Sequence, residues 1–87
     1  MINKKIVIRC ASGLHARPAA NVMKAAKKHA CKVQIMNKEK TANAKSLVEI
    51  LGLGANCGDE VVILCDGEGE EAAAAEMKAI IEDNIGG

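Results

Sequence analysis

The segment from Ser12 to Ala19 holds the residues of this chain that are best suited, by type and spacing, to chemistry. His15 and Arg17 fall at the start of a predicted helix, where unpaired backbone N–H groups and the helix dipole favour an anion. The positive end of the helix disfavours imidazolium, so the imidazole stays a neutral nucleophile. The guanidinium of Arg17 and the N–H groups of residues 16 and 17 can donate to phosphate oxygens. The pattern indicates a phosphohistidine site.

The residues alone leave a structural role for His15 equally open, because an imidazole at a helix start can simply cap the helix. Pro18 suits the first turn, where its missing N–H costs nothing, and Gly13 allows a tight loop before it. His29 lies at the end of the same predicted helix, among lysines. A cation suits that negative end, so we interpret His29 as structural or solvated.

The composition predicts one small folded domain over residues 1–87. The chain is 49% hydrophobic and 26% charged, without Phe, Tyr or Trp. Its core must therefore come from aliphatic residues, Met and Ala, which predicts a modest stability. A net charge of +1 argues against nucleic-acid binding by bulk charge, and the missing aromatic residues argue against base stacking. The apolar runs are too short to span a membrane and no signal peptide is evident, so we expect a cytoplasmic protein without membrane insertion.

The cysteines do not form a motif for metal or redox chemistry. The chain has four of them, with no Cys-x-x-Cys spacing: Cys10, Cys31, Cys57 and Cys65. We expect free thiols in a reducing cell, and we expect no metal or bound cofactor.

Hydrophobic periodicity predicts seven elements in the order β-α-β-β-α-β-α. The expected strands cover residues 2–10, 31–36, 41–44 and 60–65, and the expected helices cover 16–29, 47–51 and 70–84. This order predicts an α+β fold, a two-layer open-faced sandwich with a four-stranded antiparallel sheet and three helices on one face.

Two of the predicted helices carry further signals. The first has an apolar stripe at helical spacing, formed by Ala19, Val22, Met23, Ala26 and Ala30. Before the second, Ser46 is a good N-cap, and Glu49 three positions later completes a capping box. Leu47, Val48 and Leu51 cannot all point inward from one short helix, so we expect part of this set to be exposed and Ile50 to be core.

Two blocks of sequence resemble the HPr family, the histidine-containing phosphocarriers of the bacterial sugar phosphotransferase system. The block Leu14-His15-Ala16-Arg17-Pro18-Ala19-Ala20 looks like that family's active-site motif. A second block, Asn43-Ala44-Lys45-Ser46-Leu47-Val48 followed by Leu53-Gly54, is similar to its regulatory serine region. The blocks keep the family's separation, and the resemblance covers essentially the whole chain.

The resemblance implies a covalent phosphoryl carrier that is not itself an enzyme. His15 would accept the phosphoryl group through Nδ1 from enzyme I, which takes it from phosphoenolpyruvate, and would pass it to IIA domains of sugar permeases. Arg17 would balance the phosphate charge. Ser12, Ala16 and Pro18 would support the site.

The resemblance also implies regulation and a docking surface. Ser46 matches a serine that an ATP-dependent kinase phosphorylates, so HPr kinase/phosphorylase and a catabolite-control transcription factor are further expected partners of this monomer. The family's docking surface corresponds to Ala20, Lys24, Lys27, Leu47, Val48 and Leu51.

This chain departs from the family pattern at two places. Lys38-Glu39 stands where the hairpin turn often carries Asn-Gly, which predicts a strained or reshaped turn. Glu49 lies inside the regulatory region, where some members have a small residue, and this makes regulation through Ser46 less secure than chemistry at His15. The alternative function is a regulatory binding module that uses the same surface.

Overall fold

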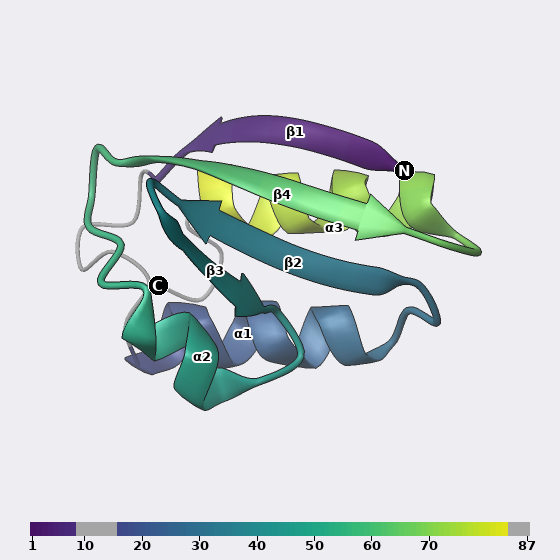
Figure 1. Ribbon diagram of the computed structural model, residues 1–87. Coiled ribbons are helices and arrows are strands. Elements are labelled where there is room, and N and C mark those ends of the chain that lie inside the picture. Colours follow the sequence, from purple (N-terminus) through teal and green to yellow (C-terminus); the bar gives the residue numbers. More distant parts are fainter. Residues whose placement is uncertain (9–15, 84–87) are drawn as a thin grey trace.

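The computed structural model describes residues 1–8 and 16–83, and the side chains of residues 1–8 and 19–82. The predicted element order is confirmed (Figure 1). The elements are β1 (Ile2–Val7), α1 (Ala16–Lys27), β2 (Lys32–Asn37), β3 (Lys40–Asn43), α2 (Leu47–Gly52), β4 (Glu60–Asp66) and α3 (Glu70–Asp83).

The four strands form one antiparallel sheet in the order β1-β4-β2-β3. Ile6 of β1 lies opposite Val61 of β4, and Ile35 of β2 lies between Ile63 of β4 and Ala42 of β3. Since β4 is inserted between β1 and β2, the last strand of the chain holds the first two together. This register places the alternate apolar residues of all strands on one face.

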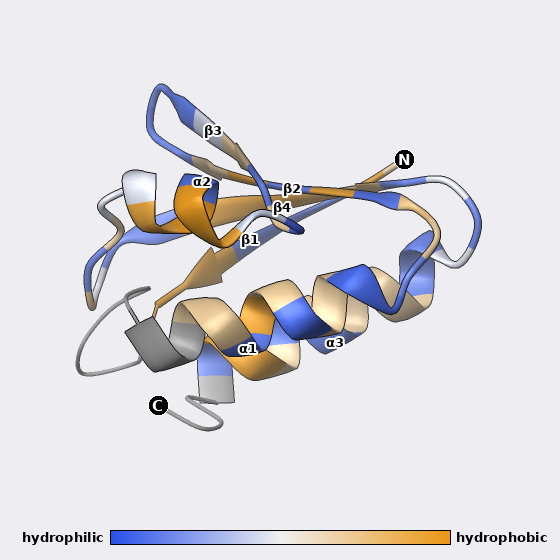
Figure 2. Cartoon of the chain, turned by 90° about the horizontal axis from the view of Figure 1, so that it is seen from below, coloured by the Kyte–Doolittle hydropathy of each residue, from blue (hydrophilic) through white to orange (hydrophobic). Residues whose placement is uncertain are grey.

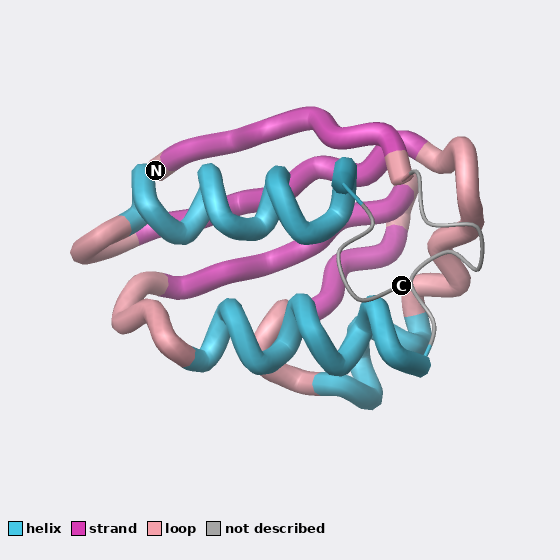
Figure 3. Tube along the Cα trace, turned by 180° about the vertical axis from the view of Figure 1, so that it is seen from behind, coloured by secondary structure: helices cyan, strands magenta, loops and turns pink. Residues whose placement is uncertain are grey.

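Helices cover that face and leave the other face of the sheet open (Figure 2). Viewed from behind, α1 and α3 lie side by side over the sheet and run roughly along the strands (Figure 3). The short α2 follows β3 and packs against α1. The expected two-layer open-faced sandwich is therefore confirmed.

The core between the two layers is aliphatic and tightly closed. Fully buried side chains from the sheet include Ile6, Val33, Ile35, Val61 and Ile63, and Ile8, directly after β1, is buried with them. Buried alanines occupy the helical side: Ala19, Ala25, Ala26, Ala73 and Ala74. Such small side chains let α1 and α3 approach each other and the sheet closely, which is how a chain without aromatic residues closes its core.

Several predicted boundaries need correction. The strand expected over 2–10 ends at Val7, since Ile8 is described and lies outside it, whereas Arg9 and Cys10 lie outside the described residues. Helix α1 ends at Lys27 instead of residue 29, so Ala30 is exposed and its place in the apolar stripe was wrong. Ala25 takes part in the core instead, because the helix turns it toward α3 and the sheet. The bounds of β2, β3, β4 and α2 differ from the predicted ones by one residue, and residue 84, predicted as the last of α3, lies outside the described residues.

The turn of the β2–β3 hairpin has a strained backbone, as its sequence predicts. Asn37 pairs with Lys40, which leaves a two-residue turn of Lys38 and Glu39. Lys38 has a φ of 58°, and it is the only non-glycine residue at positive φ in the described part of the chain. An L-residue with a Cβ adopts this left-handed region at a cost of about 1 kcal/mol or more.

Replacing Lys38 by asparagine should relieve this strain. We expect Lys38→Asn to raise the free energy of unfolding by about 0.5–1 kcal/mol, because asparagine tolerates the left-handed region. Urea denaturation would measure the change, with Glu39→Asn as the matched control at negative φ. A gain from Glu39→Asn equal to that from Lys38→Asn would contradict this explanation.

Candidate functional site

Helix α1 begins at Ala16, directly after His15 in the chain, as the sequence predicts. Ser12 and His15 themselves lie outside the described residues, as do the side chains of Ala16, Arg17 and Pro18. The start of the helix is therefore the part of the predicted phosphohistidine site that the structure describes, and the first turn of a helix presents N–H groups that have no partner within the helix.

The residues of the expected docking surface belong to two helices that contact each other, α1 and α2. On α1, Ala20 is half-buried, whereas Lys24 and Lys27 are exposed in its last turns. On α2, Leu47 packs partly against the core, while Val48 is 79% exposed and Leu51 is 40% exposed. We call these six residues the docking surface. Two of its large apolar side chains face solvent beside a helix that carries lysines.

The short helix α2 buries some of its apolar side chains and exposes others, as the sequence predicts. Ile50 is fully buried, whereas Val48, two residues earlier, is the most exposed large apolar side chain among the described residues. Neighbours two residues apart lie on nearly opposite sides of a helix, so a six-residue helix can anchor itself and still present an apolar surface.

Ser46 is the N-cap of α2, with extended backbone angles, and its Oγ accepts a hydrogen bond from the Glu49 N–H at 3.4 Å. The predicted reciprocal half of the capping box was wrong. The Ser46 N–H donates to the Asn43 carbonyl at 2.9 Å, so the Glu49 carboxylate instead accepts from the Asn43 N–H at 3.1 Å. Glu49 thus fastens the end of β3 to α2 and places a carboxylate in the same turn as Ser46.

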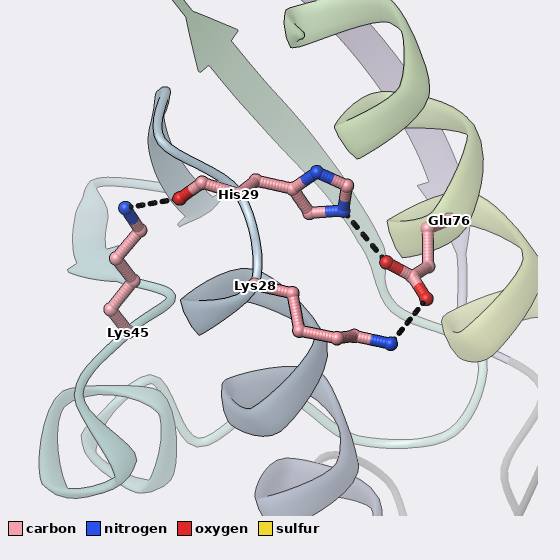
Figure 4. Close-up of polar contacts among 4 residues, drawn as sticks. All are labelled: Lys28, His29, Lys45 and Glu76. Atoms are coloured by element: carbon pink, nitrogen blue, oxygen red, sulfur yellow. Dashed lines mark hydrogen bonds and ion pairs between the residues drawn. The ribbon is translucent and has the colours of Figure 1, made fainter.

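A polar network that the sequence did not reveal joins α1, α3 and the segment before α2 (Figure 4). Nε2 of His29 lies 2.7 Å from Oε1 of Glu76, and Nζ of Lys28 donates to the other carboxylate oxygen at 3.1 Å. Lys45, next to Ser46, donates to the His29 carbonyl at 2.8 Å. The structural interpretation of His29 is confirmed, but its partner Glu76 is 47 residues away, a separation that no local pattern reports.

The network lowers the pKa of Glu76 below its ordinary value of 4.5, first through the hydrogen bond from His29 and then through that from Lys28. A carboxyl group whose pKa is lowered by folding stabilises the protein above its unfolded pKa, and this contribution is lost as the pH falls through the lower folded value. The stability that the network supplies is therefore present at neutral pH and lost on acidification below about pH 4.5.

We therefore expect Glu76→Gln to be less stable than the parent at neutral pH and to lose less stability between neutral pH and pH 3. Thermal melts across this range would measure both effects. Glu71→Gln, at an exposed position of the same helix, is the matched control. Parallel pH profiles for the parent and Glu76→Gln would contradict the assignment.

Free thiols are confirmed for the three described cysteines, Cys31, Cys57 and Cys65. Burial, together with the neighbouring Cys31, raises the pKa of Cys65 to about 11, which makes it an unreactive packing residue. Cys10 lies outside the described residues. Within residues 1–8 and 16–83, no group of three His, Cys, Asp or Glu side chains is placed to hold a metal ion, and no helix there is long and apolar enough to cross a membrane.

Comparisons with known proteins agree on one family. The family model described as the PTS HPr component phosphorylation site matches residues 2–83. The phosphocarrier protein HPr of Borreliella burgdorferi is 35% identical over 82 residues, which cover 94% of this chain and 95% of that protein. A crystal structure of HPr-C-His from Thermoanaerobacter tengcongensis, 34% identical, has a TM-score of 0.95 and is matched over 100% of this chain and 98% of that one. Crh, the Bacillus subtilis catabolite repression protein, is 32% identical, with a TM-score of 0.75 and 93% of each chain covered, in a structure of an intertwined dimer with a swapped domain.

Proposed function

Because this chain belongs to the HPr family of phosphocarrier proteins, we propose that it accepts a phosphoryl group on His15 from enzyme I and passes it to IIA domains of sugar permeases. A role in the phosphotransferase system follows from the family itself. The proposal further assigns residues 1–87 to one carrier domain that works in the cytoplasm as a monomer. The observation that carries it is the start of α1 at Ala16, which directly follows His15.

The proposed transfer uses His15 as nucleophile. Its Nδ1 lone pair attacks the phosphorus of the donor, so an N–P bond forms as the bond to the donor breaks. Arg17 and the free N–H groups at the start of α1 donate to the phosphoryl oxygens and offset their charge. Ser12, Ala16 and Pro18 support this geometry. Since the partner supplies the leaving group or the acceptor, the chain acts as a carrier and each transfer depends chiefly on positioning.

The docking surface is the proposed contact with enzyme I and IIA domains. Val48 and Leu51 expose apolar area, and Lys24 and Lys27 on the neighbouring helix add positive charge. An exposed apolar patch next to cations suits brief contact with acidic partners, because charge steers the encounter and a small apolar area keeps it reversible.

Ser46 is the proposed regulatory site, with HPr kinase/phosphorylase and a catabolite-control transcription factor as its partners. Its hydroxyl caps α2, the helix that carries the docking residues Leu47, Val48 and Leu51. A phosphate there adds a charge of about −2 to the docking surface while the helix N-terminus tolerates it. Regulation would therefore act on docking more than on the fold.

A carboxylate on the docking surface should weaken docking to an acidic partner. We expect Val48→Asp and Ser46→Asp each to raise the KM for transfer from enzyme I about tenfold, with a smaller change in kcat. Steady-state phosphotransfer kinetics would measure both constants, with Thr41→Asp on the exposed part of β3 as the control. Unchanged transfer rates for both variants would count against this surface.

The carrier function is tested by incubating the purified chain with enzyme I and phosphoenolpyruvate. Intact mass should show one phosphoryl adduct, and acid should remove it, because a phosphoramidate hydrolyses in acid whereas a phosphoserine does not. A folded chain that forms no adduct with a competent enzyme I would favour the regulatory binding module instead, with the Ser46 region as its working surface.

A further inference from the structure

A cavity of about 550 Å³ lies between the tip of the β2–β3 hairpin and the segment that joins α2 to β4. Its lining consists of Asn37, Lys38, Glu39, Lys40, Leu53, Gly54, Asn56 and Asp59. None of these residues belongs to the proposed phosphoryl site or to the docking surface. The volume is in the range of small-molecule sites, which raises the question of what the cavity could hold.

One wall of the cavity contains a buried hydrogen-bond acceptor that has no donor among the residues that the structure describes, on the side chain of Asn37. Asn37 follows Val33 and Ile35 on the inner face of β2, and it is the only buried polar residue among the described side chains, at 6% exposure. Its Nδ2 donates to the Leu53 carbonyl at 3.2 Å, which fixes the orientation of the amide. Its Oδ1 has no hydrogen-bond partner in the described part of the chain. A buried acceptor without a donor is costly, so the site is short of an N–H or O–H group.

Charges of both signs line the cavity. Lys38 and Lys40 supply two cations, and Glu39 and Asp59 supply two carboxylates. None of the four forms an ion pair with another described residue. One oxygen of Asp59 accepts from the Asn56 N–H at 2.9 Å, which holds the carboxylate in place and leaves its second oxygen for another donor. A ligand that carries a single charge would therefore be attracted by two of these side chains and repelled by the other two.

We propose that this cavity binds a small zwitterion of the free amino-acid class. Its ammonium group donates to Oδ1 of Asn37 and to the Asp59 carboxylate, and its carboxylate is held by Lys38 and Lys40. The ammonium supplies the donor that Asn37 lacks, and the two ligand charges match the two kinds of charge on the lining. The site is separate from the proposed carrier chemistry.

Binding requires a small rearrangement of the cavity wall, because Oδ1 of Asn37 has almost no exposed surface. Lys38 and Glu39, exposed in the two-residue turn beside Asn37, are the part of the wall that can move most easily. The Asn37 side-chain amide should therefore report binding directly.

The test is a ¹H–¹⁵N NMR titration of the full chain with three matched probes. L-leucine carries both charges, leucinamide carries only the ammonium, and N-acetyl-leucine carries only the carboxylate. We expect saturable shifts of the Asn37 side-chain amide and of the Gly54 backbone amide with leucine, and binding at least about tenfold weaker for the other two. Shifts that do not saturate, or that are equal for the three probes, would identify a solvent-filled hollow and overturn the proposal.

Two variants locate the site. Asn37→Leu should abolish leucine binding. Asp59→Asn keeps an acceptor for the Asn56 N–H and should weaken leucine binding about tenfold. Glu60→Gln, exposed at the neighbouring position and outside the lining, is the matched control. If Asn37→Leu fails to fold, the comparison of Asp59→Asn with Glu60→Gln decides, and equal affinities in that pair would overturn the proposal. Phosphorylation by enzyme I is not part of any readout, so this result is independent of the proposed carrier function.

Discussion

Replacing His15 by alanine is expected to abolish the acid-labile phosphoryl adduct that enzyme I and phosphoenolpyruvate form on the parent chain. An alanine offers no lone pair to the phosphorus, and neither the N-terminus of α1 nor Arg17 can substitute for a nucleophile. The effect is therefore a loss of the reaction itself, in contrast to the tenfold changes expected at the docking surface. Intact mass after a fixed incubation, with and without acid treatment, measures it.

His29→Ala is the matched control, because the chain has two histidines. The ring of His29 is hydrogen-bonded to Glu76. In the sequence His29 follows the end of α1, whereas His15 precedes its start. His29→Ala should keep the adduct and lose some stability. An acid-labile adduct on His15→Ala would show that the phosphoryl group sits elsewhere and would remove the basis of the proposed mechanism.

The second large effect concerns Ile50, the buried anchor of α2. We expect Ile50→Ala to lower the free energy of unfolding by about 3 kcal/mol, because it leaves a cavity that the surrounding core fills only in part. In a small domain without aromatic residues, this is a large share of a total stability of about 5 kcal/mol or somewhat more. Urea denaturation at neutral pH would show the change as a lower midpoint with a similar slope.

Val48→Ala is the control on the same helix. Val48 is 79% exposed, so its truncation should change the free energy of unfolding by less than about 0.5 kcal/mol while it weakens docking. Together, Ile50→Ala and Val48→Ala distinguish the residue that anchors α2 in the core from the residue that contacts partners, within one six-residue helix. Comparable destabilisation by both variants would mean that α2 does not divide its side chains as described.

The sequence by itself determined the features that depend on residues close together in the chain. Alternation in β2 and β4 and the helical spacing in α1 and α3 gave the element order, and a lone short helix with four apolar residues had to expose some of them. The start of α1 after His15 followed from local signals, Pro18 and the change of period. The strained turn at Lys38 followed from the missing Asn-Gly pair, since turn geometry depends on the turn's own residues.

Only the tertiary structure decided which distant groups meet. The capping-box pattern predicted that the Glu49 side chain would accept from the Ser46 N–H. In the structure the Ser46 N–H donates to the Asn43 carbonyl where β3 leads into α2, so the Glu49 carboxylate accepts from the Asn43 N–H instead. Glu76 reaches His29 because α1 and α3 lie side by side on the sheet. Asn37 lies just beyond the strand predicted over residues 31–36, but in the structure it is the last residue of β2 and is buried at the wall of a cavity. Local propensity acts over a few residues, whereas these contacts join segments that only the strand order β1-β4-β2-β3 and the packing of the helices bring together.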